Sequence, residues 1–317
     1  MNTEARDKVT EILGFAPSFE SETIWVWETA IGEFRLAPII IDGTDGSFIA
    51  FIHNSKAGPW RGHVCPGINE IIEITTQYKK KMASIQADID SYLRVMYDIK
   101  WRTEIIGYMV RGDHPNRDIS LLPLFMKVET IALHIRTVIE FIALASLAAN
   151  KPLFEQEGDN FKEFWKAKLI FKDIEKKNPD FYPKPIEPIH MTDIEDISRN
   201  IRFIEDGYMT RDKCVEVYDK CCEILHPQNP FAEDQNRNYE DLLNQFPDWI
   251  NLIKQLLNYH VFRLVGSNDF YVLHMHDDVI DLAYDGRGIS HPFMYPLQLD
   301  KLPSEIQAKL RGERETE

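Results

Sequence analysis

The chain of 317 residues is long enough for one large domain or for two domains of ordinary size. Hydrophobic residues make up 44% of the chain and charged residues 27%, which is typical of a folded protein and does not favour disorder. The balance of 36 basic against 51 acidic residues gives a net charge of −15. Such a field repels nucleic acid unless a local basic patch is present.

Neither a signal peptide nor a membrane span is predicted. The N-terminal segment is charged throughout and lacks an apolar core of the kind that signal peptides have. The longest apolar stretch, Val138 to Ala149, contains Glu140 and is too short to cross a bilayer. The four cysteines include no C-x-x-C pair. We therefore expect a cytoplasmic protein that does not associate with a membrane.

Residues 1–68 are predicted to form a β-rich N-terminal region. Thr3 to Leu13 has the pattern of a short amphipathic helix. Residues 23–53 are rich in Ile, Val, Phe and Trp and are interrupted by Gly and Pro, which is typical of strands and hairpins. Residues 54–67 are expected to be a loop. Three tryptophans are expected in the core of this region rather than in a base-stacking surface: Trp25, Trp27 and Trp60.

Residues 69–259 are predicted to form a helical bundle. Apolar residues recur at spacings of three and four from Asn69 to Val110. A second helix, Leu121 to Ala149, is apolar around most of its circumference, which places it at the centre of a bundle, and we expect it to end before Pro152. The remaining helices are expected at 161–176, 192–204, 210–226 and 239–259, with an extended proline-rich connector at 178–188.

Residues 260–317 are predicted to form a β-hairpin followed by a charged tail. The apolar period changes to two in HVFRLV and FYVLHMH, and the turn sequence GSND separates these two runs. The tail from Lys301 is charged and is expected to be loose. The fold class is therefore mainly α, with a β-rich N-terminal appendage and a C-terminal β-hairpin.

The stretch VYDKCCEILHPQNPF, from Val217 to Phe231, is the best candidate for a functional site. At 100° per residue the expected core stripe of this helix consists of Cys214, Val215, Tyr218, Cys221, Cys222 and Leu225. His226 then flanks the stripe at the helix end, and Lys220 lies nearly opposite it. The simplest interpretation is a solvated lysine and a helix-terminal histidine that the helix dipole favours.

Lys220-x5-His226 resembles the Arg-x4-6-His motif of HEPN domains, a superfamily of helical bundles that includes many metal-independent ribonucleases. A wider resemblance to uncharacterised bacterial HEPN-like proteins covers about residues 120–295, on RTVIEFIALASLAAN, NPDFYPKPIEP, ILHPQNPF and the hairpin. The resemblance implies a HEPN-like bundle, a homodimer whose two motifs face each other, and a role in bacterial defence or toxin–antitoxin systems. No metal or other cofactor is implied.

By that resemblance the chain is a metal-independent endoribonuclease with two catalytic residues. His226 would be the general acid/base at the ribose 2′-hydroxyl or the leaving oxygen, and Lys220 would stabilise charge on phosphorus. Lys220 stands where the motif has arginine, and it lacks the planar fork that binds phosphate in a bidentate way. The implied partners are RNA, a second copy of the chain, and an antitoxin or other regulatory protein.

Two alternatives stay open. In the first, the bundle is a non-catalytic binding or scaffold module that recognises a protein or a small ligand. An acidic surface suits a protein partner better than it suits RNA. A metal hydrolase built on His274 and His276 is a more distant alternative. Arg136 and Glu140, one turn apart in the most apolar helix, are expected to form a structural ion pair.

Overall fold

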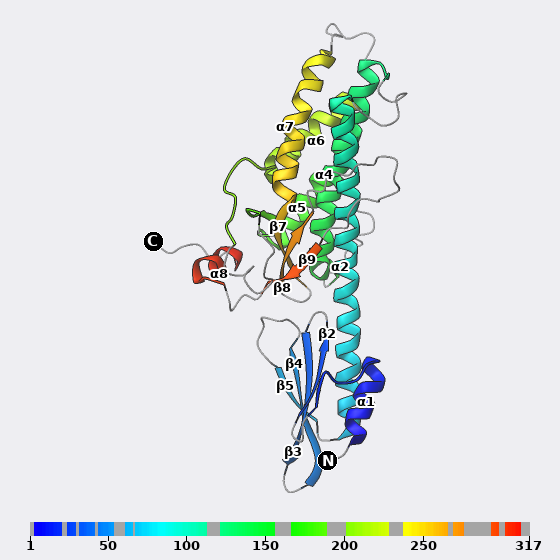
Figure 1. Cartoon of the computed structure of the whole chain (residues 1–317), viewed down its shortest axis with the longest axis vertical. Coiled ribbons are helices and arrows are strands. Elements are labelled where there is room, and N and C mark those ends of the chain that lie inside the picture. Colours follow the sequence, from blue (N-terminus) through cyan, green and yellow to red (C-terminus); the bar gives the residue numbers. More distant parts are fainter. Residues whose placement is uncertain are drawn as a thin grey trace.

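The computed structural model shows a mainly α protein with two small antiparallel sheets, elongated along its longest helix (Figure 1). The structure describes residues 3–20, 24–29, 32–41, 44–53, 61–65, 67–112, 121–155, 166–188, 201–227, 237–265, 269–275, 293–297 and 302–311.

The helices of the described residues are α1 (Thr3–Leu13), α2 (Ile68–Arg111), α4 (Leu124–Glu155), α5 (Ala167–Lys177), α6 (Arg211–Leu225), α7 (Tyr239–Leu257) and α8 (Ser304–Arg311). The first sheet joins β1 (Phe19–Glu20), β2 (Trp25–Thr29), β3 (Gly32–Ile41), β4 (Thr44–His53) and β5 (Arg61–Cys65) in chain order. The second sheet joins β6 (Lys184–Pro185), β7 (Tyr259–Leu264), β8 (Asp269–His274) and β9 (Phe293–Pro296), also in chain order.

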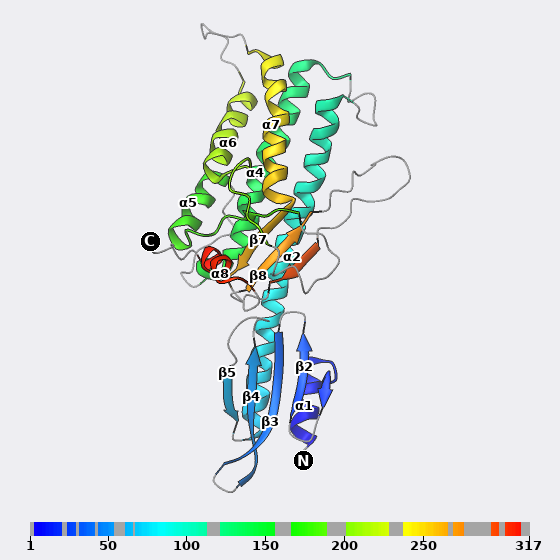
Figure 2. The same cartoon turned by 60° about the vertical axis from the view of Figure 1, so that its left-hand side comes forward.

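The N-terminal region is a five-stranded meander packed against α1 and the first turns of α2, as Figure 2 shows. In β2, β3 and β4 alternate positions point toward these helices, so the apolar side chains of one sheet face form a core. Its buried residues are Ala5, Val9, Leu13, Trp25, Trp27, Phe34, Leu36, Ala50, Ile52, Cys65, Ile71 and Tyr78. The expected core positions of Trp25 and Trp27 are therefore confirmed, while Trp60 lies outside the described residues.

Helix α2 joins the N-terminal region to the bundle without a break. Its 44 residues correspond to a length of about 66 Å at 1.5 Å per residue. Ile71 and Tyr78 belong to the N-terminal core, whereas the buried residues from Ile85 onward belong to the core of the bundle. Met82 packs against both cores. The helix begins where the sequence predicted, but its first turns are part of the β-rich region.

Helix α4 occupies the centre of the bundle and contacts α2, α5, α6 and α7. It continues through Pro152 to Glu155, so the predicted end before this proline is wrong. Phe154 is fully buried, and the Lys151 ammonium pairs with the Asp88 carboxylate of α2 at 2.9 Å. These tertiary contacts stabilise a last turn in which Pro152 cannot donate a backbone hydrogen bond.

The length of α4 bears on the prediction that no segment of the chain is long enough to cross a membrane. Among the described helices, Leu124–Glu155 alone is long and apolar enough to cross a bilayer, although 56% of its most apolar window is buried inside the molecule. The core helix of a soluble protein passes the same test, so this is weak evidence for a membrane span. The apolar stretch is nevertheless longer than the sequence pattern indicated.

The C-terminal sheet contains the predicted hairpin, with Val261 opposite Val272 and Tyr259 opposite His274. Two further strands extend it, because β6 of the proline-rich connector pairs with β7 and β9 pairs with β8. The described part of the tail, residues 302–311, is not loose as expected, since it contains α8. Leu302 and Leu310 are buried against Ile186, Ile201, Val261, Phe270, Val272 and Leu297.

Two further local predictions were wrong. Residues 61–65 form strand β5 rather than part of a loop, because their backbone pairs with β4. Residues 201–204 are not helical, since Phe203 forms an isolated bridge with Ile186. The rest of the helix expected at 192–204, like most of the loop expected at 54–67, lies outside the described residues.

Candidate functional site at the end of α6

Helix α6, which carries the candidate catalytic pair, is capped at both ends. The Thr210 hydroxyl accepts a hydrogen bond from the backbone N–H of Lys213 at 3.3 Å, as predicted for its N-cap. At the other end the Arg237 guanidinium donates to the carbonyl oxygens of Ile224, Glu223 and His226 at 2.6, 2.7 and 2.8 Å. This cation satisfies carbonyls that the helix leaves open and lies at the negative end of its dipole.

The buried face of α6 is rotated from the predicted stripe. The residues that pack into the core are Cys214, Val217, Cys221 and Ile224. Val215, Tyr218, Cys222 and Leu225 lie at its border and are only partly buried. The prediction left out Val217 and Ile224, which are buried because α4 and α5 pack against a face of the helix that is rotated from the predicted one.

Lys220 and His226 are both exposed. Lys220 Nζ donates to the Glu223 carboxylate at 3.2 Å, one turn further along the same helix. His226 is the C-cap residue with extended backbone angles, and its backbone N–H donates to the carbonyl of Cys222 at 3.1 Å. The two residues are six positions apart, so their side chains leave the helix about 120° from each other. One copy of the chain therefore does not bring the two groups to a shared reaction centre.

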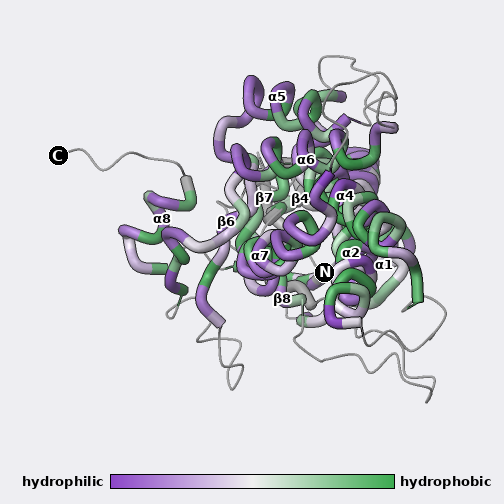
Figure 3. Tube along the Cα trace, turned by 90° about the horizontal axis from the view of Figure 1, so that it is seen from above, coloured by the Kyte–Doolittle hydropathy of each residue, from purple (hydrophilic) through white to green (hydrophobic). Residues whose placement is uncertain are grey.

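Every basic side chain of α6 is paired with a carboxylate. Arg211 pairs with Glu175 and Asp212, Lys213 with Glu216, and Lys220 with Glu223. The carboxylate of Asp219, on the same helix, binds Lys168 of α5 at 2.9 Å. Figure 3 shows hydrophilic and hydrophobic residues alternating along the turns of these two helices. To reach these cations, a phosphodiester would have to displace the carboxylates paired with them. Those carboxylates are also negatively charged and would repel the phosphate.

The expected ion pair between Arg136 and Glu140 is present. Arg136 Nε donates to Glu140 Oε1 at 3.2 Å, and the Tyr218 hydroxyl of α6 donates to the same oxygen at 3.3 Å. Burial and the nearby Glu140 carboxylate raise the pKa of Tyr218 to about 12. Burial also raises the pKa of the Cys222 thiol, against the opposing effect of Arg136. Neither group is therefore a ready nucleophile at neutral pH.

The histidines considered for a metal site serve other contacts or lie outside the described residues. His274 is buried and stacks on Tyr259 with ring centroids 3.9 Å apart, whereas His276 lies outside the described part of the chain. His260 is fully buried between Tyr92 and the Leu257 carbonyl. Within the described ranges, no cluster of three or more His, Cys, Asp or Glu residues could hold a metal ion.

His260 belongs to a buried polar group that the sequence did not reveal. Its Nδ1 lies 2.9 Å from the Leu257 carbonyl, which can only accept, so the proton is on Nδ1. Nε2 then accepts from the Tyr92 hydroxyl at 2.9 Å. Burial lowers the pKa of His260 to about 4. Nearby, the buried Lys100 ammonium donates to the Met275 carbonyl at 2.5 Å.

These buried polar residues are structural anchors between α2 and the C-terminal sheet. The sequence offered one sign of them: Lys100 lies four residues after Met96, at a position of α2 where the apolar repeat predicts a buried residue. No local pattern pairs Tyr92 with a residue 168 positions away.

Comparisons with protein-family models, with curated proteins and with solved structures give no match to the chain. The HEPN-like family assignment consequently stays a prediction from the sequence.

Proposed function

We propose that this protein is a non-catalytic binding or scaffold module built on a HEPN-like bundle, with a basic protein surface as its partner. The observation that carries the proposal is the pairing of every basic side chain of α6 with a carboxylate. The helix has four acidic side chains and three basic ones, and the whole chain carries a net charge of −15. This net charge favours a cationic protein over RNA as the partner.

The architecture also supports a scaffold. Helix α2 is continuous from the core of the N-terminal sheet to the core of the bundle, so it fixes the direction between the two regions. A partner that binds the sheet region would therefore be held at a defined place relative to a partner on α6.

A metal-independent endoribonuclease is the second candidate. The observation that favours it is the exposure of both Lys220 and His226 near the same end of α6, where a second copy of the chain could supply the missing group. In a homodimer, His226 of one copy would transfer the proton while Lys220 of the other stabilises the phosphorane. This function would belong to a defence or toxin system with an antitoxin or other regulatory protein as partner.

One assay separates the two functions. The full chain is incubated with total bacterial RNA in EDTA beside Lys220→Ala and His226→Ala, with Lys213→Ala as a matched control on the same helix. We expect intact RNA in every reaction. Cleavage by the wild type and by Lys213→Ala, but not by His226→Ala, would overturn the non-catalytic proposal and establish the ribonuclease.

The binding function needs its own positive test. The tagged protein is cross-linked in its own cells, and cross-linked peptides are identified by mass spectrometry. We expect one basic protein to be linked near α6 in the wild type and in His226→Ala. Neutralising three carboxylates in one variant, Glu216→Gln, Asp219→Asn and Glu223→Gln, should weaken that link strongly. Unchanged cross-linking in this variant would contradict the role assigned to the acidic surface.

A further inference from the structure

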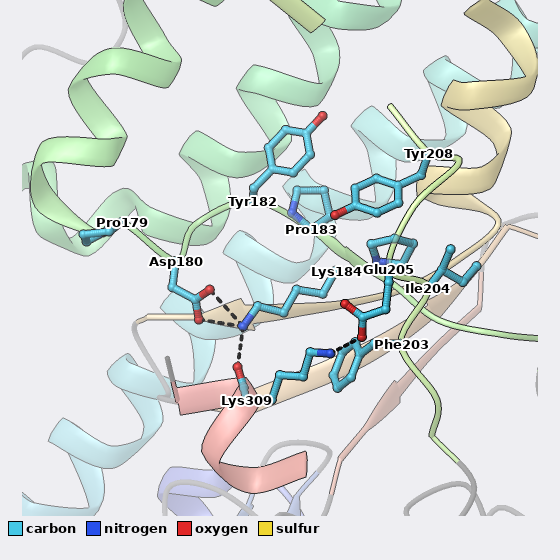
Figure 4. Close-up of a pocket in the computed structure, with 11 residues that line it drawn as sticks. Pro179, Asp180, Tyr182, Pro183, Lys184, Phe203, Ile204, Glu205, Tyr208 and Lys309 are labelled. Carbon is cyan, nitrogen blue, oxygen red and sulfur yellow. Dashed lines mark hydrogen bonds and ion pairs between the residues drawn. The ribbon is translucent and has the colours of Figure 1, made fainter. Parts of the chain in front are cut away.

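A small cavity lies between three segments that are far apart in the sequence: the proline-rich connector after α5, the chain that leads into α6, and α8 (Figure 4). Its volume is about 230 Å³, which is below the range of about 300–1,000 Å³ that is common for ligand pockets. The cavity therefore suits a ligand with a single ring. The residues that matter for what it binds are Pro183, Lys184, Phe203, Glu205, Tyr208 and Lys309.

One of the two lysines at this cavity is structural. Lys184 Nζ lies 2.8 and 2.9 Å from the two carboxylate oxygens of Asp180, and it donates to the Lys309 carbonyl at 2.7 Å. An ammonium group has three protons, so these acceptors use its capacity. Lys184 thus attaches α8 to the connector and has no donor left for a ligand.

The other lysine is available for exchange. The Lys309 ammonium lies 5.0 Å from the centre of the Phe203 ring and pairs with the Glu205 carboxylate. The Glu205 side chain is 75% exposed, so it can move into water without leaving a buried charge. Exposed pairs of this kind contribute little, about 0–1 kcal/mol. An anion from solution can therefore replace Glu205 while the Phe203 ring still holds the ammonium in place.

The cavity also has flat apolar walls. In Figure 4 the Tyr208 ring lies beside Pro183. The rings of Tyr208, Phe203 and Pro183 provide surfaces against which a planar ring can pack.

We propose that this cavity binds a small aromatic carboxylate. The ligand carboxylate replaces Glu205 on Lys309, while its ring packs against the apolar walls of the cavity. A cationic ligand is disfavoured. Its ammonium, if bound to Glu205, would be repelled by the Lys309 ammonium, which the Phe203 ring and helix α8 hold in place. This binding site is separate from α6 and does not depend on the function proposed for it.

The test uses the full chain and benzoate as the probe, with dissociation constants measured by ligand-observed NMR. Benzylamine has the same ring and the opposite charge, and cyclohexanecarboxylate has the same charge without the aromatic ring. We expect benzoate to bind at least tenfold more tightly than benzylamine and severalfold more tightly than cyclohexanecarboxylate. Absence of benzoate binding, or equal binding of benzoate and benzylamine, would overturn the proposal.

Variants assign the binding to this cavity. Lys309→Met should weaken benzoate binding at least tenfold, and Tyr208→Ala, which removes an apolar wall, should weaken it severalfold. Lys8→Met in α1, at another exposed lysine that pairs with a carboxylate, serves as an unchanged control. Glu205→Gln removes the competing carboxylate from an exposed position and should tighten binding severalfold. A local unfolding of α8 cannot produce that gain, so an unchanged or weaker affinity in Glu205→Gln would contradict the proposal even if Lys309→Met fails to fold.

Discussion

The two ends of α2 lie in two cores of different character. Its N-terminal turns pack against a small sheet core centred on Trp25, Trp27 and Phe34, whereas its C-terminal turns pack against the large, mainly aliphatic core around α4. Met82 is the described side chain that packs against both. One helix thus links two separate cores, and we expect each core to depend mainly on its own packing.

The largest expected effect comes from removing one tryptophan of the small core. Trp27 is fully buried, and Trp27→Ala should cost about 3–5 kcal/mol. Because few side chains connect the cores, hydrogen exchange measured by mass spectrometry should show lost protection in β2–β4 while α4 stays protected. The matched variant Trp249→Ala, in α7 of the bundle, should give the opposite pattern. Equal loss in both regions after either change would show that the two cores unfold together.

A break in α2 between the cores should separate them. Ala83 is exposed and lies next to Met82, so Ala83→Pro removes a helix hydrogen bond without disturbing a packed side chain. Its cost is about 3 kcal/mol in a helix interior. Small-angle X-ray scattering should show a broader distribution of interatomic distances than in the Ala83→Ser control. An unchanged distribution would mean that contacts other than the helix fix the two regions.

The bundle end of α2 should depend on pH through His260. Its pKa is lowered from 6.5 to about 4, so the unfolded chain binds the proton more readily than the folded chain does. The stabilisation is complete above about pH 6.5 and is lost progressively as the pH falls to about 4. This shift corresponds to about 3 kcal/mol.

Urea unfolding across that pH range checks this expectation. His260→Gln should reduce the pH dependence relative to the wild type. Asp88 acts in the opposite direction, because burial raises the pKa of its carboxyl, so the difference between the two proteins isolates the histidine. Equal pH slopes would show that His260 is not the titrating group.

The smallest effect is expected at the attachment of α1. Lys79 Nζ of α2 donates to the Ile12 carbonyl in the last turn of α1 at 2.5 Å, where the helix dipole favours a cation. Lys79→Met should cost about 0.3–1 kcal/mol and speed hydrogen exchange in α1 alone. Lys80→Met, at the neighbouring exposed position, is the control and should leave α1 unchanged.

Much of the secondary structure was predictable because it depends on local pattern. The apolar repeat of α2 gave its bounds within one residue, and the alternation in β7 and β8 predicted their hairpin. The errors occurred where a distant segment decided the outcome. Residues 61–65 pair with β4, and the end of α4 is held by Asp88 of α2. Helix α8 is stabilised by Leu310, which is buried against the C-terminal sheet.

The candidate site shows the same division. The sequence identified Lys220, His226 and the ion pair of Arg136 with Glu140 from their spacing along helices. It did not predict that Arg237 would cap α6, since that contact depends on where the next helix begins. The Lys309 cavity was equally hidden, because its walls come from three separated segments.

Most of the helices and strands followed from local sequence patterns, because apolar repeats depend on neighbours within a few residues. Which polar groups are buried and paired depended on the tertiary fold. Burial, hydrogen-bond partners and pKa depend on atoms brought together from distant parts of the chain, as with Tyr92 and His260. For the same reason one lysine of the cavity, Lys184, is a structural contact, and the other, Lys309, is the proposed site for an anion.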